Sequence, residues 1–226
     1  MISRFRREKE HYASEKTLNK VFGAGFIPSF DVMLAEKYVE NVPFVEGKRF
    51  TITEKLDGVR CMLIFNDAGE PTFFSRAGKS FDDMVELTQE VKQLNSQMVY
   101  DGELLLGVEQ VVNSADLYRM TVKVTAKDGV KTGLVYNVFD CLPKADLLNG
   151  VCVTPCEQRK QQLKDELDKL ALAHVKNVPV LYVGSDVKEI DRLCDEYTDK
   201  GREGIMVNIA DAPYECKRTK NLLKVK

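Results

Sequence analysis

A lysine lies between two stretches that both have the pattern of β-strands. The run before it, residues 49–53, alternates and is rich in β-forming residues, and the run after it, residues 61–65, is almost wholly apolar. The segment between them, Glu54 to Arg60, contains an Asp-Gly pair, which is typical of a turn. Lys55 is therefore expected at a strand end, where a sheet fixes its direction. A surface turn with a solvated lysine is the plainer alternative, and this segment alone favours it.

Other predicted strand ends carry charged residues in a similar way. Residues 101–103 (Asp-Gly-Glu) end a short predicted strand, and residues 203–204 (Glu-Gly) open an apolar one. Lys224 and Lys226 alternate in the last predicted strand, so both side chains should lie on one face of a sheet. A face with several lysines and carboxylates suits a ligand that brings anionic groups and a metal ion.

Such a set of residues can support nucleophilic chemistry at phosphorus. An amine attacks phosphorus only when it is neutral, whereas a lysine in water is almost wholly protonated near pH 7. Burial and nearby cations favour the neutral amine, and Arg60, Lys224, Lys226 and a bound metal could supply those cations. The same cations would stabilise a phosphoryl group in transit. Mg²⁺ needs few protein carboxylates where phosphates complete its ligands, and Glu203 suits that role.

The order of the motifs resembles the covalent nucleotidyltransferases, most closely the adenylation domain of ATP-dependent DNA ligases. The resemblance depends on that order, because each motif alone is weak, and it runs from about residue 30 to the last residue. Residues 32–35 are also similar to a segment that often precedes the first motif, with valine in place of proline. The matching motifs are Lys55 to Arg60, Ser75 to Gly78, Asp101 to Leu104, Val138 to Asp140, Glu203 to Val207 and Leu222 to Lys226.

The resemblance implies an α+β fold with the nucleotide pocket between two antiparallel β-sheets that are flanked by helices, as in ATP-grasp-like nucleotidyltransferase domains. Residues 1–47 are expected to be a helical lead-in that belongs to the same domain, with a helix capped by Asp31. Residues 48–226 would form the adenylation domain, in which the polar stretch 109–130 is expected to be a helix or a lid-like insertion. No OB-fold domain is recognisable in this chain. The resemblance implies one beyond Lys226, so we expect the chain to be a fragment.

Four residues are expected to act on the phosphates. Lys55 would attack ATP, form a lysine–AMP phosphoramidate and release pyrophosphate. Lys224 and Lys226 would contact the α-phosphate and share the catalytic role, and Glu203 would help to bind Mg²⁺.

The remaining motif residues imply contacts with the nucleoside and with DNA. Glu103 would accept hydrogen bonds from the ribose hydroxyls, and Phe139 would stack on adenine. Arg60 would contact the ribose or the nick phosphate, and Arg76 a phosphate of the nucleotide or of DNA.

Base recognition departs from the pattern of many ligases, which carry an acid two positions before the nucleophile. Thr53 occupies that position here, and the acid Glu54 lies next to Lys55; both belong to the expected ATP-binding set. Lys217 and Arg218, near the last strand, are the further expected DNA contacts.

Composition sets limits on partners and compartment. The 33 lysines and arginines against 35 acids give a net charge of -2, so a polyanion must be met by a local cluster of cations. The six cysteines are scattered and are interpreted as reduced thiols. No apolar stretch is long enough to span a membrane. We therefore expect a cytoplasmic location, viral or bacterial, with the nucleus not excluded and no membrane partner. A monomer is also expected.

The leading hypothesis is a ligase that seals nicked double-stranded DNA in three steps: lysine adenylation, transfer of AMP to the 5′-phosphate, and attack by the 3′-hydroxyl. An RNA ligase, an mRNA-capping guanylyltransferase, and a truncated nucleotide-binding module without full turnover remain alternatives.

Overall fold

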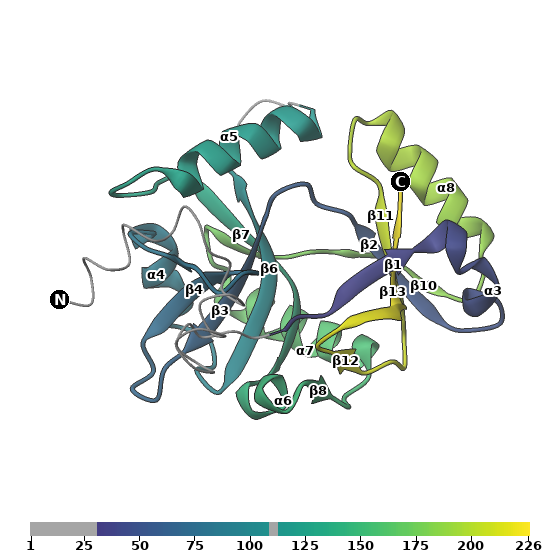
Figure 1. The fold of residues 1–226 in the computed structure, drawn as a ribbon, viewed down its shortest axis with the longest axis horizontal. Coiled ribbons are helices and arrows are strands. Elements are labelled where there is room, and N and C mark those ends of the chain that lie inside the picture. The colour runs from purple at the N-terminus through teal and green to yellow at the C-terminus, as the bar shows by residue number, and fades with distance from the viewer. Residues whose placement is uncertain (1–30, 109–112) are drawn as a thin grey trace, which may run out of the picture.

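The computed structural model describes residues 31–108 and 113–226, whose strands form two main sheets and a two-stranded ribbon (Figure 1). The first sheet has the strand order β1-β13-β11-β2-β10, and the second has the order β5-β4-β3-β6-β7-β9. Neighbouring strands are antiparallel except for two pairs, β1 with β13 and β7 with β9, which are parallel. The α+β fold with two main sheets, whose strands are mostly antiparallel, is thus confirmed.

One face of the first sheet packs against helix α8. Side chains alternate between the two faces of a strand, so the apolar ones can gather on this face. Ile190 and Leu193 of α8 are buried against Ile52 and Val207 of the sheet. The strands of this sheet are β1 (Leu34–Lys37), β2 (Phe50–Glu54), β10 (Val180–Gly184), β11 (Ile205–Ile209) and β13 (Arg218–Val225), and the nearby helices are η1 (Tyr38–Glu40), α3 (Val42–Val45) and α8 (Lys188–Asp199).

The second sheet forms the larger core with helices α4 and α7. Leu87 of α4 and Leu163 of α7 are buried with Leu63 and Tyr136 of the strands. The elements of this part are β3 (Val59–Phe65), β4 (Pro71–Ser75), β5 (Ser80–Phe81), α4 (Val85–Val91), β6 (Met98–Leu106), α5 (Ser114–Ala126), β7 (Leu134–Pro143), α7 (Cys156–Leu170) and β9 (Val175–Asn177). Helix α6 (Lys144–Asn149) and the ribbon of β8 (Val151–Cys152) and β12 (Tyr214–Glu215) lie at one side of the two sheets (Figure 1).

The segment that carries Lys55 crosses from one sheet to the other. Strand β2 belongs to the first sheet and β3 to the second, so the turn between them does not close a hairpin. Gly58 is needed in this crossing because a Cβ there would lie 2.4 Å from the backbone oxygen of Leu104. The crossing places Lys55 where the two sheets meet.

Two local predictions are wrong. The helix expected to begin at Asp31 is replaced by strand β1, because residues 34–37 find hydrogen-bonding partners along β13. Residues 101–103 do not end a strand: they lie inside β6, where the register against β7 shifts between Asp101 and Gly102. In both places pairing with a distant strand outweighs the local pattern.

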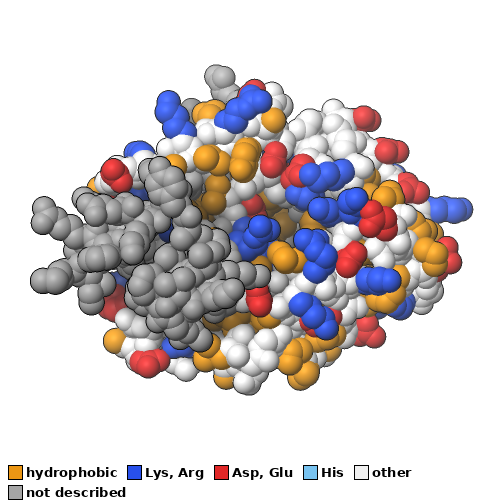
Figure 2. Space-filling model, viewed as in Figure 1, with side chains coloured by type: hydrophobic (Ala, Val, Ile, Leu, Met, Phe, Trp, Pro, Cys, Tyr) orange, Lys and Arg blue, Asp and Glu red, His pale blue; other side chains and the backbone are white. Residues whose placement is uncertain are grey.

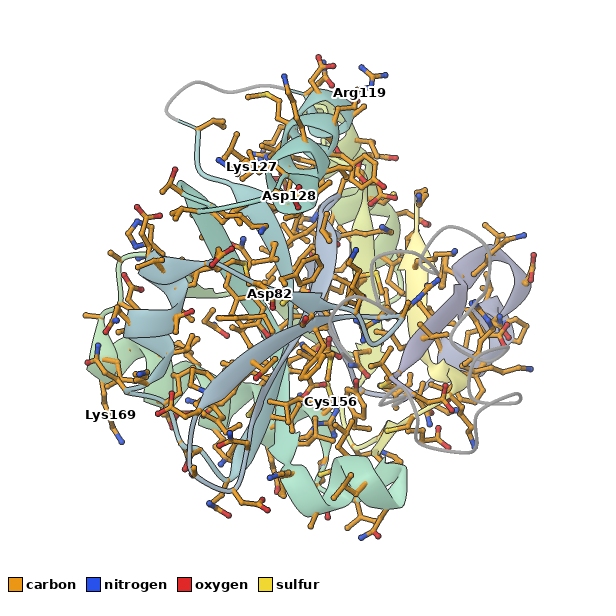
Figure 3. The ribbon with its side chains drawn as sticks, turned by 60° about the vertical axis from the view of Figure 1, so that its left-hand side comes forward. Asp82, Arg119, Lys127, Asp128, Cys156 and Lys169 are labelled. Carbon is orange, nitrogen blue, oxygen red and sulfur yellow. The ribbon has the colours of Figure 1, made fainter. Side chains whose placement is uncertain are left out.

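Helix α5 confirms a helix within the polar stretch, at residues 114–126. Arg119 stands on its outer side (Figure 3), and its side chain is 75% exposed. The rest of the lead-in, residues 1–30, and residues 109–112 lie outside the described residues, and the division at residue 47 stays a prediction. Within the described residues, no helix combines the length and apolarity needed to cross a bilayer.

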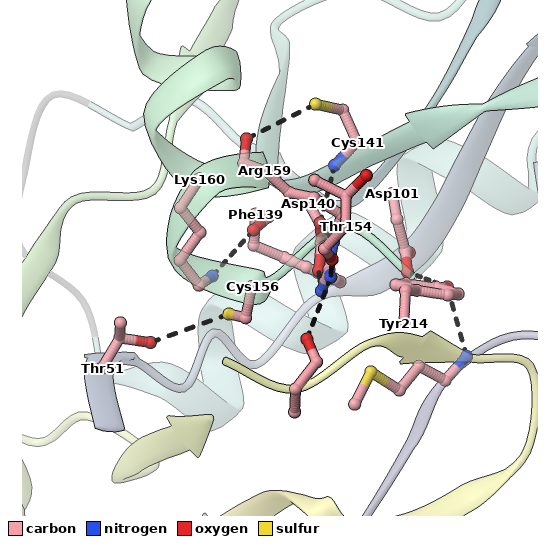
Figure 4. A network of polar contacts seen from close by, with 12 residues as sticks. Thr51, Asp101, Phe139, Asp140, Cys141, Thr154, Cys156, Arg159, Lys160 and Tyr214 are labelled. Carbon is pink, nitrogen blue, oxygen red and sulfur yellow. Dashed lines mark hydrogen bonds and ion pairs between the residues drawn. The ribbon is translucent and has the colours of Figure 1, made fainter. Parts of the chain in front are cut away.

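A buried ion pair joins helix α7 to strand β7 (Figure 4). Arg159 donates from Nε to Oδ1 of Asp140 at 2.8 Å and from Nη2 to Oδ2 at 2.9 Å. It also donates to the backbone oxygens of Thr154 and Ala212. Arg159 and Asp140 are almost fully buried. Helix α7, strand β7 and the loop after β11 therefore share one charged anchor.

We expect Arg159→Met to lower the free energy of unfolding by about 3–5 kcal/mol, because it leaves the Asp140 carboxylate buried without its partner. Arg49→Met is the matched control, since Arg49 pairs with Glu157 of the same helix at an exposed position; its cost should be at most about 1 kcal/mol. Urea unfolding followed by circular dichroism measures both. Equal effects of the two variants would contradict the anchoring role.

Candidate active site

A cavity of about 260 Å³ lies between the two main sheets, at the crossing that carries Lys55. Its walls bring together motifs that are far apart in the sequence. On the face shown in Figure 2, Lys and Arg side chains gather along the middle of the molecule and toward the first sheet. Predicted site residues that line the cavity are Thr53, Glu54, Lys55, Arg60, Arg76, Glu103, Phe139, Arg218 and Lys224.

Lys55 is held by the sheet and paired with Glu203. Its backbone N–H donates to the carbonyl of Gly204 at 3.0 Å, which continues the pairing of β2 with β11. Its ammonium donates to one oxygen of the Glu203 carboxylate, and the ammonium of Lys226 donates to the other. Burial alone would raise the pKa of Glu203, but the hydrogen bonds from both lysines outweigh it and hold the pKa below its usual value. Two lysine ammonium groups thus share one carboxylate in the site.

Arg60 is fixed at the cavity wall by a buried carboxylate. Its Nε donates to Oδ1 of Asp101 at 2.9 Å, and the hydroxyl of Tyr214 donates to Oδ2 of the same residue at 2.6 Å. Burial opposes the charge on Arg60, yet Asp101 keeps the pKa of the guanidinium above its usual value. The guanidinium carbon lies 5.2 Å from the ring centroid of Phe139. Arg60 therefore presents a permanent positive charge in a single orientation.

Glu103 is the site carboxyl whose pKa is shifted most. It lies directly opposite Arg60 where strand β6 pairs with strand β3. Burial raises its pKa to about 8, and the positive charges of Arg60 and Lys55 only partly offset that effect. Near neutral pH the carboxyl is therefore largely protonated, so it can both donate and accept hydrogen bonds at a ribose.

Some cavity residues were not predicted from the sequence. Lys160 on α7 donates to the carbonyl of Phe139 at 2.9 Å and is buried, and Tyr214 and Asn208 also line the cavity. A signal for Lys160 exists in the spacing of the buried face of α7, where it falls one turn after Cys156. Asn208 could have been found by alternation in β11, two residues after Met206.

Of the remaining predicted site residues, one lines the cavity and the others lie outside its lining. Arg218 lines the cavity and donates to the carbonyl of Ala35. Lys217 is not among the lining residues: its ammonium lies 2.8 Å from Glu215, and its side chain is 67% exposed. Glu203 and Lys226 are not among the lining residues either: Glu203 contacts Lys55, and Lys226 contacts Glu203.

A dedicated metal cage is not present in the described part of the chain, where no three His, Cys, Asp or Glu side chains are grouped closely enough to hold an ion. A Mg²⁺ ion that takes most of its ligands from phosphates and water is compatible with this donor set, because it needs only one or two carboxylates. Glu203 is the carboxylate best placed beside Lys55.

Comparisons with known proteins agree with this architecture. The family model of the ATP-dependent DNA ligase domain matches residues 32–226. The chain is 24% identical to the DNA ligase of Enterobacteria phage T4 over 97% of this chain and 53% of that protein. It is 28% identical to a DNA ligase of African swine fever virus (isolate Pig/Kenya/KEN-50/1950) over 78% of this chain and 38% of that protein. The chain thus spans about half, or less, of these relatives.

Solved structures show the same fold. The structure named Pmar-Lig_PreS3 is 27% identical and superposes with a TM-score of 0.74, covering 95% of this chain and 51% of that chain. The ATP-dependent DNA ligase from bacteriophage T7 in complex with ATP is 16% identical, with a TM-score of 0.68 over 87% of this chain and 68% of that chain.

The raised pKa of Glu103 predicts a specific pH dependence of stability. A folded-state pKa above the unfolded value stabilises the fold at low pH, and this contribution is lost as the pH rises from about 4.5 through about 8. We therefore expect Glu103→Gln to gain unfolding free energy relative to the unmodified chain across this window. Urea unfolding at several pH values measures the difference, and two parallel curves would contradict the assignment.

Proposed function

Because the chain belongs to the family of ATP-dependent DNA ligase domains, we propose that it is the adenylation domain of a DNA ligase and that Lys55 carries AMP covalently. The observation that carries this proposal is the position of Lys55, at the crossing of the two sheets, lining the cavity and paired with Glu203. A lysine aimed from a rigid strand end into a pocket of cations suits attack on a nucleotide phosphate.

In the first step the ammonium of Lys55 would release a proton to water, and the neutral amine would attack the α-phosphorus of ATP. The P–N bond forms, and the bond from the α-phosphorus to the bridging oxygen breaks. Pyrophosphate leaves with that electron pair. Lys224, which lines the cavity, and Lys226, which shares Glu203 with Lys55, would stabilise the negative charge on the α-phosphate.

The nucleoside would occupy the wall formed by β3, β6 and β7. Phe139 would stack on the adenine, and Lys160 holds the backbone of Phe139 in place. Glu103 and Arg60, which are paired across two strands, would contact the ribose hydroxyls. Thr53 and Glu54 complete the nucleotide-binding wall on the side of the first sheet.

Magnesium is the proposed metal cofactor, and Glu203 would hold it together with phosphate oxygens. When bound, Mg²⁺ neutralises charge on the phosphates.

The second and third steps act on nicked double-stranded DNA. AMP would pass from Lys55 to the 5′-phosphate, and the 3′-hydroxyl would then displace AMP. Arg60, Arg76 and Arg218 line the cavity and would contact DNA phosphates, with the exposed Lys217 at its periphery. We also propose that an OB-fold domain beyond Lys226 completes the DNA site, and that the protein is a cytoplasmic monomer.

Labelling tests the first step. Incubation with Mg²⁺ and ATP labelled at the α-phosphate should leave label on the protein, and Lys55→Ala should abolish it. Lys144→Ala is the matched control, since Lys144 pairs with the exposed Asp67 away from the cavity. Labelling that persists in Lys55→Ala would contradict the assignment.

The same assay separates the alternatives. Preferential labelling by GTP would favour a capping guanylyltransferase, and transfer of AMP to RNA ends rather than to nicked DNA would favour an RNA ligase. Thermal stabilisation by ATP without a covalent product would favour a nucleotide-binding module.

Salt dependence tests the DNA contacts. Arg76→Met should weaken binding of nicked duplex DNA and reduce the slope of log affinity against log salt by about 0.9, the value for one lost phosphate contact. Lys144→Met should change neither quantity. An unchanged slope in Arg76→Met would show that Arg76 does not contact a DNA phosphate.

A further inference from the structure

Alternate side chains of strand β11 line the cavity. Ile205 and Val207 are buried in the core against α8, whereas Met206 and Asn208 line the cavity on the opposite face. The backbone N–H of Lys55 donates a hydrogen bond to the carbonyl of Gly204, so the end of the cavity that holds the proposed nucleophile lies at the start of β11. Asn208 is four residues further along, at roughly 13 Å for an extended strand. It therefore lies toward the end of the cavity that faces away from the nucleophile.

Asn208 has a buried oxygen that the protein itself does not satisfy. The residue is only 5% exposed, and its Oδ1 is buried without a hydrogen-bond partner. Among the described residues no other buried side-chain oxygen or nitrogen lacks a partner. Buried polar groups are almost always paired, and an exception calls for a reason. A ligand that brings a donor to the cavity would supply the missing partner.

The chemistry of a carboxamide matches adenine. It offers one accepting oxygen beside two N–H donors, and its terminal torsion is broad, so a half turn of the amide group exchanges the oxygen and the nitrogen and brings the oxygen to the cavity side. Adenine carries an amino donor beside an accepting ring nitrogen, which is the pattern that asparagine reads. Guanine carries a carbonyl oxygen in place of that amino group, so a carboxamide held with its oxygen toward the base would be repelled by guanine.

Two neighbouring side chains are poorly suited to this role. Thr53 stands two positions before Lys55 and opposite Met206, and it has no carboxylate with which to read an amino group. Lys160 carries only donors, and its ammonium is already bonded to the carbonyl of Phe139.

We propose that Asn208 is a specificity-determining residue that accepts a hydrogen bond from the exocyclic amino group of adenine and so selects ATP. This inference rests on the proposed function, because it takes the cavity to be the nucleotide site. Strand β11 would then carry the residue that recognises the base.

The test compares ATP with purine riboside triphosphate, which lacks the amino group, in the full chain. Binding is measured by calorimetry in the Lys55→Ala background, so that no covalent step intervenes. With Asn208 present, ATP should bind about tenfold more tightly than the analogue, because the analogue leaves a buried acceptor unpaired. Asn208→Leu should bring this ratio close to one, whereas Asn208→Asp, which keeps an acceptor, should preserve it.

Thr51→Val is the control, since Thr51 lies directly opposite Asn208 in β2 and does not line the cavity; it should leave the ratio unchanged. The inference is overturned if Asn208→Leu retains the preference for ATP, or if Asn208→Asp loses it. Either result leaves the proposed function standing as long as ATP still labels Lys55 in the unmodified chain. Absence of both labelling and binding in that chain would instead overturn the proposed function.

Discussion

The site depends on the carboxylate of Glu203, which holds the ammonium groups of Lys55 and Lys226. These lysines stand at the end of β2 and just after β13, and β11 lies between those two strands. The contact can form only when the first sheet has assembled in this order. The proposed nucleophile, its neighbouring cation and the proposed metal ligand are thus brought together by the pairing of three strands, which ties the chemistry to the integrity of the sheet.

Beneath that contact, buried ion pairs fix the walls of the cavity before any ligand arrives. Asp101 orients Arg60, and Asp140 anchors Arg159 under the cavity. Compared with apolar residues in both positions such pairs contribute little net stability, because desolvation of the charges offsets their attraction, although removing one partner alone is costly. Their effect is to hold side chains in one orientation, and a site that binds phosphates gains when its cations need not reorganise.

Most of the fold and many of the residues that line the cavity can be predicted from the sequence, and the physical reasons can be named. Helices α7 and α8 carry apolar residues at helical spacing, a pattern that can be recognised in the sequence alone. Motifs in a fixed order that resemble a family single out Lys55, Glu103 and Lys224 as expected site residues, and all three line the cavity. The strand β1 and the crossing after β2 were missed, since both depend on pairing between segments that are distant in the chain. Asn208 belongs to no recognised motif, and only its burial and its unpaired oxygen draw attention to it.

The central claim is that Lys55 becomes covalently bound to AMP, and an intact-mass spectrum tests it most directly. The purified protein, incubated with ATP and Mg²⁺, should gain the mass of one AMP, and peptide mapping should place that mass on Lys55. Treatment with pyrophosphate should remove it, because the first step is reversible. A protein that gains no mass, or that carries the added mass on another residue, would contradict the account.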